Sequence, residues 1–73
     1  MNIEFEKAVG QKIRRYREEK GFTQEQLSAK LQVEGCDITR SALAKMEVGQ
    51  RHIYLDEFKL LAELLGVQYS ELL

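Results

Sequence analysis

The chain has 73 residues, of which 44% are hydrophobic and 32% are charged, and its formal net charge is −1 at pH 7. These proportions are those of a folded domain and exclude an intrinsically disordered chain. The single cysteine and the single histidine exclude an internal disulfide and a structural zinc site.

The length limits how the chain can be organised and stabilised. We expect residues 1–73 to form a single domain, because this length leaves no room for a second one. Domains of this size bury only about 60–65% of their unfolded surface, so they often need an added source of stability. Since neither a disulfide nor a metal can supply it, we expect the chain to self-associate.

No part of the sequence has the features of a membrane or export segment. The longest apolar stretches, such as residues 60–62, are far too short to span a bilayer. The first six residues lack the basic region and the apolar run of a signal peptide. We therefore expect a cytoplasmic protein without membrane contacts.

Charge is unevenly distributed along the chain. Residues 1–51 hold ten Lys or Arg and eight Asp or Glu, whereas residues 52–73 hold one Lys and four acids. The first segment is therefore slightly basic and the second is acidic. A nucleic-acid-binding protein favours excess positive charge, so this distribution is mild support for such a role.

Apolar residues at helical spacing predict the first two helices. The spacing from Phe5 to Tyr16 predicts an amphipathic helix over residues 4–19, ended by a glycine that can take the left-handed cap conformation. Thr23 can cap a second helix in a capping box with Gln26, and this helix runs at least through Leu31.

Capping residues and apolar residues at helical spacing also predict the remaining helices. Thr39 can cap a third helix, which carries Leu43 and Met46 inward and ends near residues 48–49. A fourth helix is expected over residues 55–65, with either Asp56 or Tyr54 at its start, and a last helical turn over residues 69–73. No run alternates with period two for long enough to predict a strand, so the fold class is all-α.

Three stretches together resemble one family. They are Ile13 to Leu27, Thr39 to Gly49 and Leu60 to Val67. The joint pattern resembles the phage Cro and lambda-repressor-like family, often called the XRE family. This resemblance implies a compact lambda-repressor-like DNA-binding domain of four to five helices, with a helix-turn-helix formed by the second and third helices.

The resemblance also implies which residues contact double-stranded DNA. Thr39, Arg40, Ser41 and Lys45 match positions that face base edges in the major groove. Four further residues match positions that contact phosphates at the start of the second helix and after the third. These are Thr23, Gln24, Gln50 and Arg51.

Two other features concern the geometry of the helix-turn-helix. Arg17 and Glu47 match positions that often form an ion pair between the first and third helices, which would orient the third helix. The connection between the second and third helices, Gln32 to Ile38, is longer than the three residues usual in the family. Such a connection relaxes the tight turn and adds two acids near the DNA side.

The sequence allows two interpretations for several other residues. Cys36 is either incidental or a redox-sensitive thiol whose pKa nearby acids would raise, and His52 is interpreted as a surface residue. Some residues near the end of the chain either complete the core or form a patch for a second subunit. They are Tyr54, Tyr69, Leu72 and Leu73.

Nothing in the sequence indicates catalysis. It has no glycine-rich phosphate loop, no cluster of metal ligands and no cysteine–histidine pair in a suitable context. We expect no enzyme activity, no cofactor and no small-molecule ligand. The leading hypothesis is a sequence-specific DNA-binding transcriptional regulator, acting as a repressor and a homodimer. The alternative is a protein-interaction module on the same fold, such as an antitoxin or an adaptor.

Overall fold

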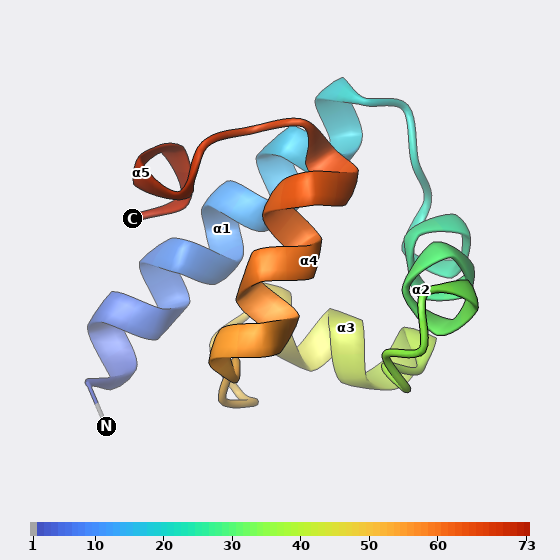
Figure 1. Cartoon of the computed structure of the whole chain (residues 1–73). Coiled ribbons are helices and arrows are strands. Elements are labelled where there is room, and N and C mark those ends of the chain that lie inside the picture. The colour runs from blue at the N-terminus through green and yellow to red at the C-terminus, as the bar shows by residue number, and fades with distance from the viewer. Residues whose placement is uncertain (1) are drawn as a thin grey trace.

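The computed structural model describes residues 2–73, and these residues form five helices and no strand (Figure 1). The predicted all-α class is therefore confirmed. Helix α3 packs against both α1 and α2, while α1 also contacts α4 and α5. In chain order the helices are α1 (Ile3–Glu19), α2 (Gln24–Val33), α3 (Arg40–Glu47), α4 (Leu55–Leu65) and α5 (Tyr69–Leu72).

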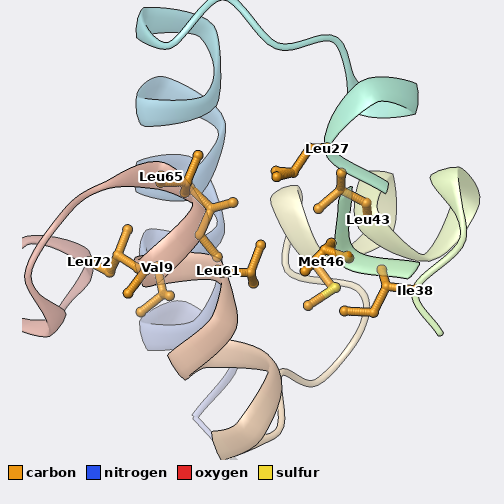
Figure 2. Close-up of a cluster of buried hydrophobic side chains, with 11 residues drawn as sticks. Val9, Leu27, Ile38, Leu43, Met46, Leu61, Leu65 and Leu72 are labelled. Carbon is orange, nitrogen blue, oxygen red and sulfur yellow. The ribbon is translucent and has the colours of Figure 1, made fainter. Parts of the chain in front are cut away.

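One apolar cluster between the helices forms the core (Figure 2). All five helices contribute buried side chains to it, and α3 contributes Leu43 and Met46 as its sequence pattern predicts. Burying a side chain of this size stabilises the fold by about 1.5–3 kcal/mol relative to leaving it exposed. The largest fully buried side chains are Ile13, Leu27, Leu31, Ile38, Leu43, Met46, Leu61 and Leu72.

The helices of the helix-turn-helix begin where the capping residues predict. The Thr23 hydroxyl accepts a hydrogen bond from the Gln26 backbone at 3.0 Å, and the Gln26 side chain accepts one from the Thr23 backbone at 2.9 Å. The Thr39 hydroxyl accepts a hydrogen bond from the Ala42 backbone at 3.1 Å. Each cap satisfies amide groups that a helix start leaves without partners, which is worth about 1 kcal/mol.

The structure decides between the two possible starts of the fourth helix. Tyr54 is the residue before α4, and its backbone N–H donates to the Glu57 carboxylate at 3.0 Å. Asp56 lies inside the first turn, where a negative charge interacts favourably with the helix dipole. The expected final turn is present as the short helix α5.

The long connection between α2 and α3 differs from its predicted bounds. Helix α2 continues two residues past Leu31 and ends at Val33, so the residues outside both helices are 34–39. Gly35 takes a left-handed conformation with φ 85°. The backbone N–H of Cys36 then donates to the Leu31 carbonyl at 2.9 Å, which satisfies a carbonyl at the end of the helix.

The same connection is held to α2 by side chains rather than left relaxed. Ile38 is fully buried in the core. Its carbonyl accepts hydrogen bonds from the Ser28 hydroxyl at 2.7 Å and from the Gln32 amide at 3.2 Å. The added residues therefore form an anchored loop, and the start of α3 is positioned despite the length of the connection.

Gly10 allows the close approach of α1 to the end of α3. A Cβ atom at this position would lie 2.9 Å from the carbonyl oxygen of Glu47 and would also collide with that of Met46. Both atoms belong to the backbone, so neither can move aside cheaply. Glycine is required here for its small size and not for an unusual backbone conformation, because Gly10 lies within a regular helix.

We predict that Gly10→Ala destabilises the fold by about 1–3 kcal/mol, as overpacking does. Helix propensity alone predicts the opposite sign, a gain of about 0.5–1 kcal/mol. Urea unfolding followed by circular dichroism measures the difference. Gln11→Ala, at the exposed neighbouring position, is the control and should change stability little. A stabilised Gly10→Ala variant would contradict the close packing.

Candidate nucleic-acid interface

Helix α3 has one buried face and one exposed polar face. Its buried face consists mainly of Leu43 and Met46, both without solvent exposure. The exposed face carries a cationic guanidinium, a cationic ammonium and two hydroxyls, which can donate several hydrogen bonds outward. These exposed residues are the four predicted base contacts, Thr39, Arg40, Ser41 and Lys45.

The N-terminus of α2 presents a second group of predicted contact residues. Thr23 is exposed and caps the helix, and Gln24 is its first residue. The first amide groups of a helix have no partner within the helix and carry partial positive charge. This end of α2 therefore offers backbone donors beside the Gln24 side chain, an arrangement suited to an anion.

A polar hollow of about 560 Å³ joins the ends of these two helices to α1. Three of the six residues that line it are arginines, and one is an acid. Arg14 is not among the contact residues predicted from the sequence, although its position three residues before Arg17 indicates that both lie on one side of the helix. The lining residues are Arg14, Arg17, Thr23, Gln24, Glu25 and Arg40.

Arg17 and Glu47 form a bidentate ion pair between α1 and α3. The Arg17 Nε lies 2.7 Å from Glu47 Oε2, and its Nη2 lies 3.1 Å from Glu47 Oε1. The two residues are only 7% and 2% exposed. Arg17 also donates to the Phe22 carbonyl at 2.8 Å. The structure thus brings together the two residues that the sequence proposes as a pair.

Gln24 extends this pair to the start of α2. Its side-chain amide donates to Glu47 Oε1 at 3.1 Å. One carboxylate therefore receives donors from α1 and α2 while belonging to α3. Since the amide carries two hydrogens, Gln24 keeps one donor for an external ligand. This network fixes how the exposed face of α3 is oriented relative to the N-terminus of α2.

The loop after α3 contains two predicted phosphate contacts in different settings. Gln50 is exposed. Its backbone N–H donates to the Lys45 carbonyl at 2.8 Å, at the end of α3. The Arg51 guanidinium is instead bound to both carboxylate oxygens of Glu57, at 2.8 and 3.0 Å, and to the His52 carbonyl at 3.0 Å. Arg51 thereby ties the loop to α4 and has fewer donors left for a phosphate.

Cys36 and His52 each lie beside acidic residues. Burial, followed by the charges of Glu57 and Asp56, raises the pKa of the Cys36 thiol, which is the direction expected for an unreactive cysteine. His52 Nδ1 lies 2.7 Å from the Glu6 carboxylate.

Within residues 2–73 no group of His, Cys, Asp or Glu could hold a metal ion. No helix in the same range is long and apolar enough to cross a membrane.

We predict that Glu47→Gln destabilises the fold by about 3–5 kcal/mol, because it leaves the buried Arg17 charge without a counterion. Replacing both partners with apolar residues, as in Arg17→Met with Glu47→Leu, should recover most of this loss. Urea unfolding of the two variants measures the difference. If the single and double variants are equally unstable, the burial of an unpaired charge is not the cause.

The Arg51–Glu57 pair predicts a pH-dependent contribution to stability. The Arg51 hydrogen bonds lower the pKa of Glu57 below its ordinary value of 4.5. The contribution is therefore fully present above pH 4.5 and is lost as the pH falls through the lower folded-state pKa. We predict that the stability difference between wild type and Glu57→Gln, measured by urea unfolding, shrinks below pH 4.5. A difference that stays constant between pH 7 and pH 3 would contradict this.

Comparisons with known proteins agree with this geometry. The chain matches the helix-turn-helix family over residues 13–72. No curated protein matches it. Among solved structures it is similar to the crystal structure of the DNA-binding domain of BldD, with a TM-score of 0.84 and 27% sequence identity, covering 100% of this chain and 99% of that one. The chain belongs to the XRE-type helix-turn-helix family.

Proposed function

We propose that the protein is a sequence-specific DNA-binding transcriptional regulator whose α3 enters the major groove. The observation that carries this proposal is the continuous polar surface formed by the exposed face of α3 and the arginine-lined hollow beside it. The similarity to a DNA-binding domain over the whole chain supports the same function. The fold is also typical of regulators that are not enzymes.

The exposed residues of α3 have the chemistry that base recognition requires. The Arg40 guanidinium can bond bidentately to O6 and N7 of guanine. Lys45 can reach a guanine or a phosphate, and the Thr39 and Ser41 hydroxyls can contact several bases. Ser41 and Lys45 are one helical turn apart, so both can face the groove from one side of α3.

The hollow suits a DNA phosphate. We propose that Thr23, Gln24 and the adjacent amides of α2 hold one backbone phosphate, with Arg14 as an added cationic donor. Arg17 is neutralised by Glu47, so the positive charge of this site comes from Arg40 and from Arg14, whose exposed pair with Glu18 is long at 3.5 Å. Gln50 is the proposed phosphate contact on the other side of α3. Glu57 balances the charge of Arg51, so the contact proposed for Arg51 uses the N–H groups that Glu57 and His52 leave free.

We propose that two copies bind one site and that binding represses transcription. Recognition helices of such dimers enter successive major grooves about 34 Å apart, so the site is a pseudo-palindrome. A dimer bound across a promoter would exclude the polymerase. A reporter gene placed behind the selected site tests repression, because an activator would raise expression.

Selection of bound duplexes from a random DNA library tests the function directly. We expect an enriched motif of two related half-sites, about ten base pairs centre to centre. A library that stays unenriched with folded protein would overturn the proposal. It would favour the alternative, a protein-interaction module on the same fold.

Two substitutions separate base recognition from phosphate binding. Arg40→Ala should weaken binding by about 1–3 kcal/mol and relax the preference at one base pair. Arg14→Ala should weaken binding evenly across sequences and reduce the salt slope of log K by about one. Fluorescence anisotropy at several salt concentrations measures both effects.

The control is Lys59→Ala, which removes one positive charge from an exposed position of α4. It should leave both the base preference and the salt slope nearly unchanged. If Arg40→Ala keeps the wild-type affinity and base preference, the assignment of α3 as the recognition helix is wrong.

A further inference from the structure

The side of α1 that lines the polar hollow carries a second exposed cation nearer the N-terminus. Arg14 lines the hollow, and Lys7 lies seven residues before it, which is two helical turns. Residues at this spacing lie on the same side of a helix. Between them, Gly10 is the point where α1 touches the carbonyls at the end of α3. The two cations therefore lie on either side of this contact along α1.

Lys7 packs directly against the loop that follows α3. A Cβ atom at Gly49 would lie 2.8 Å from the Cβ atom of Lys7 and 2.9 Å from its Cα atom. Gly49 also has φ 78°, a conformation that favours glycine. The next residue in the chain is Gln50, the proposed phosphate contact of this loop. The Lys7 side chain therefore leaves α1 beside the segment that carries Gln50.

The loop after α3 has no unpaired permanent cation of its own. Among residues 48–54 only Arg51 carries a permanent positive charge, and Glu57 balances it. Gln50 is neutral. Lys7, by contrast, is exposed and takes part in none of the ion pairs within residues 2–73. Its charge is carried on a flexible four-carbon stem, so the ammonium can reach outward past the loop.

From this arrangement we infer that Lys7 and the Gln50 side chain form a second binding site for a backbone phosphate of DNA, separate from the hollow. This inference rests on the proposed function, because it adds a contact to the same DNA complex. Lys7 supplies the positive charge, and the Gln50 amide supplies a neutral donor. The ligand class is a phosphodiester, since neither group distinguishes one base from another.

The two phosphate sites lie at opposite ends of α3. The hollow takes Arg40 from the first residue of this helix, whereas Gln50 follows the last one by three residues. A helix of 8 residues is about 12 Å long, and the major groove is about 12 Å wide. The sites can therefore hold different phosphates while α3 lies in the groove between them.

The competing interpretation is that Lys7 is only a solvated surface charge. Such a charge attracts DNA from a distance, and salt screens this attraction over about 8 Å at physiological ionic strength. Its removal would lower affinity slightly and would affect no particular phosphate. A direct contact differs, because it neutralises one phosphate and releases the counterions condensed there. The number of counterions released and the identity of the phosphate therefore separate the two interpretations.

Methylphosphonate scanning of the selected duplex tests the inference. Each phosphate is replaced in turn by a neutral methylphosphonate, and fluorescence anisotropy measures the affinity of wild type, Lys7→Ala and Arg14→Ala. We expect Lys7→Ala to weaken binding by about 10-fold and to reduce the salt slope of log K by about one. Lys7→Ala should also lose its sensitivity to one phosphate replacement that weakens wild type. That phosphate should differ from the one to which Arg14→Ala becomes insensitive.

The matched control is Lys12→Ala, which removes the same charge from α1 at a side chain that donates to the Leu73 carbonyl at 2.9 Å. It should keep the wild-type salt slope and phosphate profile. Circular dichroism should show that all variants are folded.

The outcomes separate this inference from the proposed function. If Lys7→Ala keeps the wild-type affinity and phosphate profile, the inference is overturned while DNA binding stays in place. Loss of sensitivity at the same phosphate as in Arg14→Ala, or an equal effect of Lys12→Ala, also overturns it. A folded wild-type protein that binds no duplex overturns the proposed function and the inference with it.

Discussion

Arg17 and Glu47 place two full charges where almost no solvent reaches them, and the surrounding structure is organised to satisfy both. Removing such charges from water costs several kcal/mol for each ion, and their attraction repays this only with good geometry and additional hydrogen bonds. The Phe22 carbonyl supplies one additional bond and the Gln24 amide another. Because the three helices must meet at a defined angle to complete this network, the pair orients α3 more than it stabilises the fold.

The apolar core and the anchored loop make that orientation possible. Gly10 lets α1 approach the carbonyls at the end of α3, which brings Arg17 within reach of Glu47. At the other end of α3, the Ile38 carbonyl is held by α2, so the long connection does not release the helix. The exposed face of α3 is therefore fixed from both ends by contacts that lie behind it.

Most of the fold could be predicted because its signals are local. The Thr23 and Thr39 caps depend on residues three positions away, and the burial of Leu43 follows from helical spacing. The contacts that the sequence did not predict join distant segments. One of them is the hydrogen bond that the Gln24 amide donates to the Glu47 carboxylate. The binding of Arg51 to Glu57 follows from how the loop meets α4, and no motif signals it. For the same reason, the sequence identifies candidate contact residues but not which of their donors remain free.

The buried network of Arg17, Glu47 and Gln24 lies behind α3 and holds the polar face of that helix in position before DNA binds. Titration of isotope-labelled protein with the selected duplex, followed through arginine side-chain Nε–H resonances, tests it most directly. We predict that the Arg40 resonance shifts on binding, whereas the Arg17 Nε–H stays protected from solvent exchange before and after binding, because its bond to Glu47 is already in place. An Arg17 Nε–H that exchanges rapidly in the free protein, or an Arg40 resonance that does not respond to DNA, would contradict this arrangement.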